Sequence, residues 1–388
     1  MKISSRAQNI APSATLSITA KAKEMKKQGI DVVSFAAGEP DFDTPLLIKE
    51  AAKKAIDEGF TKYTPTSGIL ELKEAICRKL FEDNHLEYTP KEILVSNGAK
   101  QALFNIIMTL VDKDDEVIIP VPYWVSYVEM VKLALGKPVF LKTTDFMIDP
   151  DLLEKTITKK TKLLILNSPN NPTGAVYDEK LLQKIAKICI KHNIFVISDE
   201  IYEKLIYDKK HVSIASFNQK IKKLTVVING VSKTYAMTGW RIGYAAGSKE
   251  VIKAATKIQD HSTSNPSSIS QKAALAALTL QDQSYVKKMI DEYKKRRDFM
   301  MSGLSLIENI YPFYPSGAFY IFVNVEKLYQ KGIKNSVDFC QKLLEEAHVA
   351  AIPGEAFGDD RFIRLSFATD TQSIKKGLER LKNFCEGI

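Results

Sequence analysis

The sequence predicts an α/β fold, with a mostly parallel central sheet covered by helices and a smaller α+β domain after it. Short apolar runs typical of strands alternate with stretches of helical spacing, which favours parallel strands joined by helices. The length of 388 residues allows two domains. We expect an N-terminal arm over 1–45 that joins the small domain, a large domain over 46–290 and a small C-terminal domain over 291–388.

Individual elements follow from local patterns. Apolar positions at three- and four-residue intervals predict helices over 46–58 and 69–82, and Gly98 is expected to open a helix that ends near Leu110. The expected strands are 116–119, 163–166, 195–198 and 224–228, with a helix over 179–191 between two of them. A long charged helix from about Asp291, a strand pair near 314–325 and a final helix are typical of a second domain.

Composition excludes several classes of protein. The net charge of +9 comes from lysines dispersed along helical stretches, so we expect solvated faces, the basic run 294–297 included, and no nucleic-acid partner. The four cysteines are far apart and the five histidines are isolated, which argues against a metal site and a disulfide framework. No apolar run is long enough to span a membrane. These features favour a cytoplasmic protein.

Polar side chains follow three of the predicted strands. Asn171 follows the strand over 163–166, Asp199 the strand over 195–198, and Lys233 the strand over 224–228. Because ligands of parallel sheets bind at the carboxyl ends of strands, we expect an amide, a carboxylate and an amine at one edge of the sheet.

This set of side chains favours imine chemistry. A buried lysine such as Lys233 can attack a carbonyl, either on the substrate, as in an aldolase, or on pyridoxal phosphate. The cofactor also requires a carboxylate for its ring nitrogen, which Asp199 offers, and donors for its ring oxygen, which Asn171 and Tyr202 offer. Trp124 is a candidate to stack on the ring. Candidates to bind the phosphate are Gly98, Ala99, Lys100 and Arg241.

Longer motifs identify a family. The most specific are Asn167–Gly174 (NSPNNPTG) and Gly230–Gly243 (GVSKTYAMTGWRIG). Further similarity covers nearly the whole chain, at 12–15, 37–42, 62–63, 198–202, 315–320 and 364–366. Through these motifs the chain resembles class I aminotransferases of the fold-type I pyridoxal phosphate enzymes, and more narrowly the bacterial aspartate aminotransferases of subgroup Iβ (1b).

The resemblance implies a role for each candidate. Lys233 is then the Schiff-base lysine, which also moves a proton between the substrate Cα and C4′ of the cofactor. Asp199, Asn171, Tyr202, Trp124 and the phosphate residues keep the roles given above. Tyr63 reaches the phosphate of the neighbouring subunit, which implies a homodimer with shared sites. Some relatives have a serine where this chain has Gly230, so one phosphate contact must come from elsewhere.

The resemblance also implies the substrates, an amino acid and a 2-oxo acid. Arg364 binds the α-carboxylate, assisted by Asn171 and the Gly38 backbone, beside Trp124. Lys100 and Thr15 are the candidates for the distal carboxylate. We expect ping-pong transfer between aspartate and 2-oxoglutarate. The alternatives are the same chemistry on prephenate, aromatic amino acids, alanine or kynurenine, a β-lyase, and a non-catalytic regulator, which requires a fused DNA-binding domain.

Overall fold

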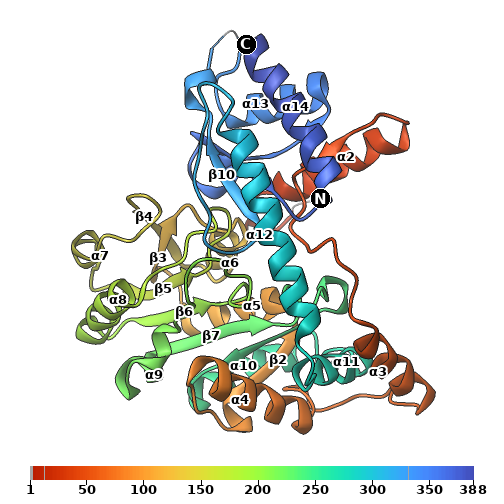
Figure 1. The fold of residues 1–388 in the computed structure, drawn as a ribbon. Coiled ribbons are helices and arrows are strands. Elements are labelled where there is room, and N and C mark those ends of the chain that lie inside the picture. Colours follow the sequence, from red (N-terminus) through yellow and green to blue (C-terminus); the bar gives the residue numbers. More distant parts are fainter. Residues whose placement is uncertain (1–2, 13, 331) are drawn as a thin grey trace.

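The computed structural model describes residues 3–12, 14–330 and 332–388, and its two main sheets lie one above the other (Figure 1). A seven-stranded sheet forms the centre of the lower part, and a four-stranded sheet lies in the upper part. The long helix α12 (Ser284–Leu304) runs from one part to the other. The site described below lies where the two parts meet.

The seven-stranded sheet has the order β2-β8-β7-β6-β5-β3-β4. Its strands are β2 (Ile93–Asn97), β3 (Glu116–Val121), β4 (Lys137–Lys142), β5 (Thr161–Asn167), β6 (Phe195–Asp199), β7 (Thr225–Gly230) and β8 (Ile242–Ala246). Neighbouring strands are parallel except at β8, which is antiparallel to both β2 and β7. The prediction of a mostly parallel central sheet is confirmed.

Helices cover both faces of this sheet, because consecutive strand residues point in opposite directions. Leu163 and Ile165 of β5 pack in one core with helices α5 (Ala99–Leu110) and α6 (Ser126–Leu133), while Leu164 and Leu166 pack in another with α8 (Glu179–His192). Both faces are apolar, so the strands have almost continuous apolar sequences. The helices of this part are α3 (Leu46–Asp57), α4 (Leu70–Asn84), α5 (Ala99–Leu110), α6 (Ser126–Leu133), α7 (Pro150–Thr156), α8 (Glu179–His192), α9 (Gln219–Leu224), α10 (Lys249–Asp260) and α11 (Ser268–Leu278).

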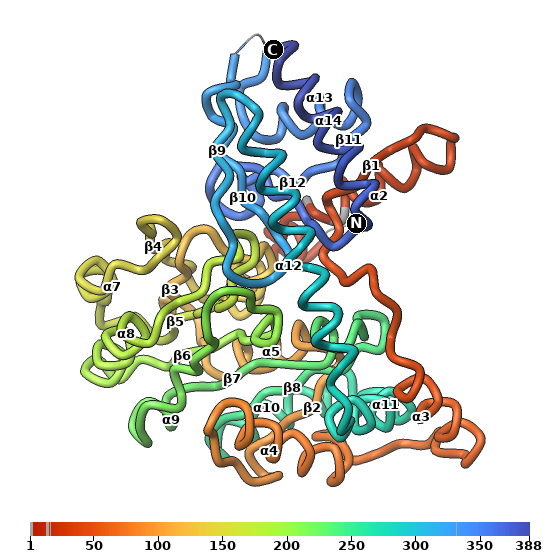
Figure 2. The backbone as a smooth tube through the Cα atoms, in the orientation of Figure 1, coloured from red at the N-terminus to blue at the C-terminus, as the bar shows by residue number. Residues whose placement is uncertain are grey.

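The upper sheet has the order β12-β13-β10-β9 and is antiparallel. Its strands are β9 (Tyr311–Pro312), β10 (Tyr320–Asn324), β12 (Ile352–Pro353) and β13 (Phe362–Ser366), and its helices are α13 (Ser336–Ala347) and α14 (Thr371–Gly387). The N-terminal chain, with α1 (Ser5–Gln8) and α2 (Ala14–Lys27), joins this part through β1 (Val33–Ser34), which pairs in parallel with β11 (Val349–Ala350) (Figure 2).

Three predicted boundaries are wrong. The long helix begins at Ser284, before Asp291, because the apolar residues Val286 and Met289 continue its buried face toward the N-terminus. Leu224 ends α9 and does not begin a strand. Residues 315–318, which we expected within a strand pair, form a loop whose Ser316 and Gly317 N–H groups donate to the Gly174 carbonyl.

The basic run on α12 is not the solvated face that the sequence predicts. Arg297 is fully buried, and its guanidinium forms ion pairs with Asp208 and with Asp298, the latter at 2.8 Å. It lies between the rings of Tyr207 and Tyr314, at 4.8 and 4.5 Å from their centroids. A charge pattern alone does not show this, because Asp208 and Tyr207 are far from Arg297 in the sequence.

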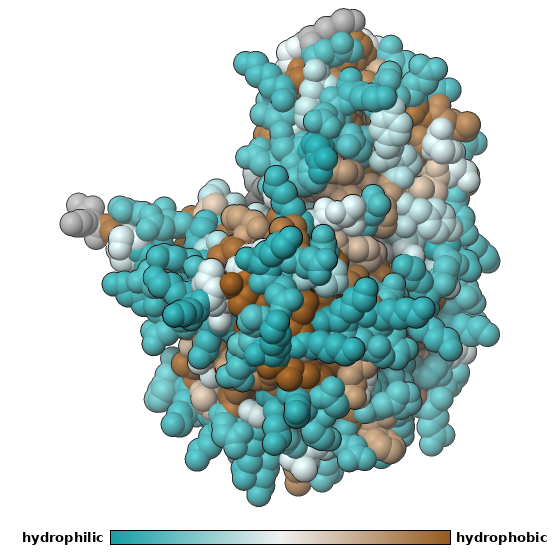
Figure 3. Space-filling model, turned by 90° about the vertical axis from the view of Figure 1, so that its left-hand side faces the viewer, coloured by the Kyte–Doolittle hydropathy of each residue, from teal (hydrophilic) through white to brown (hydrophobic). Residues whose placement is uncertain are grey.

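Much of the surface is hydrophilic, with apolar side chains gathered near the middle of the face shown in Figure 3. A groove of about 1070 Å³ near β4 and β9 is lined by aromatic residues, namely Tyr123, Phe140, Phe146, Tyr311, Phe313 and Phe362. None of the helices in the described ranges combines the length and the apolar sequence that a bilayer-spanning segment needs.

Candidate active site

The three strands that carry the predicted amide, carboxylate and amine are neighbours in the sheet. β5 pairs in parallel with β6, and β6 with β7, so all three end at the same edge. Asn167 at the end of β5 lies opposite Asp199 at the end of β6. Lys233 follows in the turn after β7.

Asp199 is a buried carboxylate, only 4% exposed. It accepts hydrogen bonds from the Tyr127 hydroxyl at 2.6 Å and from the Ile201 N–H at 3.3 Å. Burial raises the pKa of Asp199 to about 6, although the Tyr127 hydroxyl opposes the rise. A cationic partner would restore the ordinary ionisation of this carboxylate, so Asp199 is suited to a protonated ring nitrogen.

The side chain of Asn167 links Asp199 to Asn171 through two hydrogen bonds. The side chain of Asn167 donates to the Asp199 carbonyl at 3.0 Å, and its oxygen accepts the Asn171 N–H at 2.9 Å. Both asparagines are buried. The polypeptide after β5 is therefore held close to the end of β6, and the Asn171 side chain stays available for Arg364.

Arg364 is the buried cation of the site. Its Nη1 donates to Asn171 Oδ1 and its Nη2 to the Ala36 carbonyl, each at 3.0 Å. Its Nε is buried and has no hydrogen-bond partner among the described residues. The guanidinium lies 4.3 Å from the centroid of the Tyr320 ring. A buried guanidinium with an unused donor is chemically suited to bind a carboxylate.

Lys233 has the properties of an amine nucleophile. Its Nζ donates to the Gly38 carbonyl at 2.5 Å and lies 5.7 Å from the centroid of the Tyr202 ring. Burial lowers the pKa of Lys233 to about 8, with Glu39 opposing and Arg364 assisting the change. A substantial fraction of the amine is therefore neutral near pH 7.5, which a reaction with an aldehyde requires.

The start of α5 forms an anion-binding corner. Gly98 precedes the helix with φ of +83°, and the N–H groups of Ala99 and Lys100, in the first turn of α5, have no carbonyl of a preceding helical turn to bond, whereas the Gln101 N–H donates to the Gly98 carbonyl at 3.0 Å. The Arg241 guanidinium donates to the Asn97 carbonyl at 3.3 Å. A Cβ at Gly98 would lie 2.4 Å from Arg241 Nη2, so only glycine lets the guanidinium approach the helix start. Helix N-termini with a nearby arginine suit a phosphate.

The structure explains the glycine at position 230. A Cβ there would lie 2.9 Å from both the Gly243 Cα and the Ile242 carbonyl oxygen. These are backbone atoms of the neighbouring strand and cannot move aside easily. A serine at this position therefore does not fit unless the β7–β8 pair separates.

Trp124 and Lys100 form a pair near Asp199. The Lys100 Nζ lies 5.0 Å from the centroid of the Trp124 ring, a cation–π contact. Trp124 packs edge-on against Tyr127, whose hydroxyl bonds Asp199. Burial and the nearby Arg241 lower the pKa of Lys100.

Two of the predicted site residues, Tyr63 and Thr15, have surroundings that differ from those of the buried site residues described above. Tyr63 is 92% exposed, so within this chain its side chain is not packed into the site. Thr15 lies in α2, a helix that contacts β11 and β12, and its carbonyl accepts the Thr19 hydroxyl at 2.8 Å. Their expected roles stay predictions.

Three residues of the site were not among those that the sequence predicted. Tyr127 bonds Asp199, Asn167 bonds Asn171, and the Tyr320 hydroxyl lies 2.8 Å from that of Tyr202. Asn167 and Tyr320 stand inside quoted motifs, which was a usable signal. Tyr127 had only its spacing of three residues from Trp124, which places both side chains on one face of a helix start.

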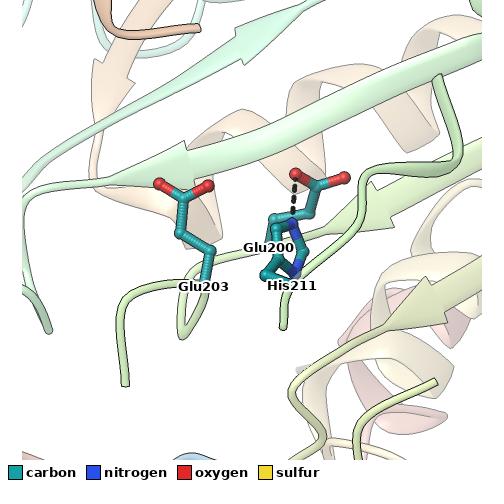
Figure 4. A group of neighbouring side chains, drawn as sticks. All are labelled: Glu200, Glu203 and His211. Carbon is teal, nitrogen blue, oxygen red and sulfur yellow. Dashed lines mark hydrogen bonds and ion pairs between the residues drawn. The ribbon is translucent and has the colours of Figure 1, made fainter. Parts of the chain in front are cut away.

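A second buried group contradicts the expectation of isolated histidines. Ligand atoms of Glu200, Glu203 and His211 lie within 4.8 Å of one another (Figure 4). His211 Nε2 is 2.9 Å from Glu200, while Glu203 bonds Lys79 and accepts from Asn84 at 2.7 Å. Although burial opposes it, the charges of Lys79 and His211 lower the pKa of Glu203 to about 2. Because Lys79 already neutralises Glu203, we assign no metal here.

Known proteins resemble this chain along its whole length. The family model for aminotransferase class I and II matches residues 30–381. The chain is 48% identical to an aspartate aminotransferase of Bacillus subtilis, over 100% of this chain and 99% of that protein. It is also 48% identical to a probable aspartate/prephenate aminotransferase of Rickettsia typhi, with the same coverage.

Solved structures show the same fold. The aspartate aminotransferase from Thermus thermophilus with maleate has a TM-score of 0.95 and 43% identity, over 99% of each chain. That from Rhizobium meliloti has a TM-score of 0.95 and 42% identity, over 100% of this chain and 99% of the other. The chain therefore belongs to the class I and II aminotransferases, as an enzyme of the pyridoxal phosphate-dependent aspartate aminotransferase family.

Proposed function

We propose that this enzyme transfers the amino group between aspartate and 2-oxoglutarate by a ping-pong mechanism. The observation that supports this best is the neighbourhood of Lys233, where an amine with a pKa of about 8 lies close to the buried carboxylate-binding Arg364. Burial lowers the pKa of Arg364 as well, although its guanidinium stays charged at neutral pH. Arg364 can thus hold the substrate carboxylate while Lys233 supplies the reactive amine beside it.

We assign the cofactor contacts to the residues that the sequence predicted. Pyridoxal phosphate, when bound, supplies an aldehyde and an electron-accepting pyridinium ring. Asp199 keeps the ring nitrogen protonated, Asn171 and Tyr202 donate to the ring oxygen, and Trp124 covers one face. Lys233 would hold the cofactor through the aldehyde carbon, with the carbonyl oxygen leaving as water. The phosphate is bound by Gly98, Ala99, Lys100 and Arg241, with Tyr63 from a second copy of the chain.

Lys233 has a further task after the amino acid has bound. It accepts the proton from the substrate Cα and returns it to C4′. An amine with a pKa of about 8 is suited to both directions of this transfer, because near neutral pH neither of its protonation states is rare. The Gly38 carbonyl, at 2.5 Å, orients Nζ for the transfer.

Substrate choice depends on two cations. Arg364 holds the α-carboxylate with the help of Asn171 and the Gly38 backbone. Lys100, with Thr15 on the arm, receives the distal carboxylate, and the contact of its Nζ with the Trp124 ring at 5.0 Å supports a position next to the residue assigned to the cofactor ring.

A second candidate substrate is prephenate. Several relatives with 45–48% identity are named probable aspartate/prephenate aminotransferases. Prephenate carries two carboxylates, as 2-oxoglutarate does, so the same pair of cations can bind it. Comparing the rates with prephenate and with 2-oxoglutarate as acceptors decides between a narrow and a dual specificity.

The half-reaction tests the proposal. The holoenzyme is mixed with one amino acid at a time, and the absorption of the bound cofactor is followed. We expect aspartate to convert it fastest and 2-oxoglutarate to reverse the change. Release of pyruvate and ammonia without an acceptor would instead indicate a β-lyase.

The lysine itself is tested by Lys233→Ala. We expect this variant to lose turnover and the visible absorption of the covalently bound cofactor, because the remaining side chain cannot attack the aldehyde. Lys253→Ala, on the exposed side of α10, is the matched control and should behave as the wild type. Retention of both properties by Lys233→Ala would contradict the proposal.

The homodimer, the cytoplasmic location and the domain boundaries 1–45, 46–290 and 291–388 stay predictions. Exposed apolar side chains on α3, Leu46 and Leu47, are 65% and 64% accessible in the single chain and support a partner on that side.

A further inference from the structure

Tyr320 occupies a buried position between the two parts of the molecule. It is the first residue of β10 and is fully buried. Its hydroxyl lies 2.8 Å from the hydroxyl of Tyr202, which is itself only 4% exposed and belongs to the segment after β6. This hydroxyl pair therefore connects the upper sheet to the end of the central sheet.

The ring of Tyr320 also supports Arg364. In the pairing of β10 with β13, Tyr320 lies opposite Ser366, and Arg364 is two residues along on the same face. This register brings the guanidinium to 4.3 Å from the ring centroid. A Cβ at Gly38 would lie 3.4 Å from the Tyr320 hydroxyl, so the backbone segment that accepts the Lys233 hydrogen bond is close as well.

The number of donors in the hydroxyl pair decides which tyrosine donates to the other. A phenol has one O–H donor and can accept two hydrogen bonds. If Tyr202 uses its only donor on the cofactor ring oxygen, as proposed above, then the proton between the two tyrosines must come from Tyr320. Tyr202 then accepts one hydrogen bond and donates another, and such chains strengthen each member.

We propose that Tyr320 is a positioning residue, which orients the Tyr202 hydroxyl toward the cofactor ring oxygen and couples it to the strand that carries Arg364. The inference rests on the proposed function. Tyr320 acts through Tyr202 and Arg364 and does not itself touch the reacting atoms. The competing explanation is packing alone, since Tyr320 also contacts the ring of Phe319 at 4.7 Å.

The variant Tyr320→Phe separates the two explanations, because it removes only the hydroxyl and keeps the ring. The readout is the absorption of the bound cofactor as a function of pH in the holoenzyme without substrate. With Tyr320 unable to donate, Tyr202 stabilises the anionic ring oxygen less well. The bound cofactor is then protonated at higher pH than in the wild type. We expect the midpoint to rise by roughly 0.5 pH unit, as loss of one cooperative hydrogen bond predicts.

A double-mutant cycle tests the route of this effect. Tyr202→Phe should raise the midpoint further than Tyr320→Phe, and adding Tyr320→Phe to Tyr202→Phe should change nothing more, because the acceptor of the Tyr320 proton is gone. The matched control is Tyr311→Phe, a phenol on β9 of the same sheet that is 50% exposed, which should titrate as the wild type.

The contact of the Tyr320 ring with Arg364 is tested by a separate measurement, the KM for the amino acid. Tyr320→Leu removes the cation–π contact and should raise the KM for the amino acid by roughly 3- to 30-fold, while Tyr320→Phe should leave KM within twofold of the wild type. A Tyr320→Phe midpoint equal to the wild type, or a shift that persists in the Tyr202→Phe background, overturns the proposal. A wild-type protein that binds no pyridoxal phosphate is a different result, which overturns the proposed function instead.

Discussion

At the residue scale, Arg364 shows how a buried charge is kept without a carboxylate partner among the described residues. Its guanidinium is 3% exposed and bonds an amide oxygen and a backbone carbonyl, which are neutral acceptors. These acceptors satisfy one donor on each terminal nitrogen, while the Nε donor stays without a partner among the described residues and the positive charge stays uncompensated. The energy of burying this charge is therefore recovered only when an anion binds.

This arrangement predicts the behaviour of Arg364→Lys. Lysine keeps the charge but loses the planar fork, so one of two charge-assisted hydrogen bonds to the carboxylate is lost. We expect kcat/KM to fall by roughly 10- to 100-fold for aspartate and for a monocarboxylate amino acid alike, as a loss of about 1.5–3 kcal/mol predicts. Steady-state kinetics with both amino acids provide the measurement.

Lys100→Ala is the comparison for Arg364→Lys. Because Lys100 is assigned to the distal carboxylate, its removal should reduce the rate with aspartate much more than the rate with alanine. Because Lys100 is also assigned to the cofactor phosphate, both rates are measured at saturating pyridoxal phosphate, where equal losses for the two substrates would contradict the assignment of the two cations.

His211 makes stability depend on pH. Burial works against its charge, but the adjacent Glu200 carboxylate outweighs burial and raises the pKa of His211 above its usual value. A raised pKa in the folded state contributes stability that is fully present below the unfolded pKa of about 6.5 and is lost as pH rises through the folded value. The melting temperature of the wild type relative to His211→Gln should therefore fall as pH rises from 6 to 9.

The control is His261→Gln, which changes an exposed histidine after α10. It reports the effect of the same His-to-Gln exchange outside the group of Glu200, Glu203 and His211, and the curve of His211→Gln is compared with it. A wild-type advantage over His211→Gln that grows with pH would show that the histidine is neutral in the folded protein.

At the element scale, α12 connects the two parts of the molecule through charges as well as apolar contacts. Arg296 pairs with Asp41 of the N-terminal chain at 2.7 Å, and Arg297 pairs with Asp208 and donates to the Pro315 carbonyl at 3.1 Å. One helix turn thus holds the N-terminal chain, the segment after β6 and the loop before β10.

Arg297→Ala should therefore destabilise the protein. It leaves the Pro315 carbonyl and two tyrosine rings without their partner, and we expect the free energy of unfolding to fall by about 1.5–3 kcal/mol. Lys295→Ala, an exposed neighbour in the same basic run, should change it by less than about 0.5 kcal/mol. Urea denaturation of the two variants measures the difference, and equal stabilities would restore the view of a solvated face.

At the scale of the whole molecule, the homodimer with shared sites stays a prediction, which depends on Tyr63. Its ring is 92% exposed, which is unusual for a large aromatic side chain expected to bind a phosphate. We expect a particle of twice the 43.5 kDa chain mass in light scattering. Tyr63→Phe should weaken pyridoxal phosphate binding by roughly 10- to 100-fold through loss of a hydrogen bond to a charged group.

Mixing two variants tests whether the tyrosine comes from the other chain. In a hybrid of Tyr63→Phe with Lys233→Ala, one site has both Lys233 and Tyr63, contributed by different chains. That site should regain the cofactor affinity of the wild type. Affinity as weak as in Tyr63→Phe alone would show that Tyr63 acts within its own chain.

The sequence by itself determined the strand–helix alternation and the polar groups at the ends of β5, β6 and β7. Both depend on local patterns, since a strand end is visible within a few residues of chain. Only the tertiary structure decided which charges are buried and what they contact. Tyr127 bonds Asp199 across 72 positions and Tyr202 meets Tyr320 across 118, while Arg297 becomes buried against Asp208. Such partners are set by how elements distant in the sequence pack together, such as α6 on the central sheet and β10 beside the segment after β6, and no local pattern encodes that packing.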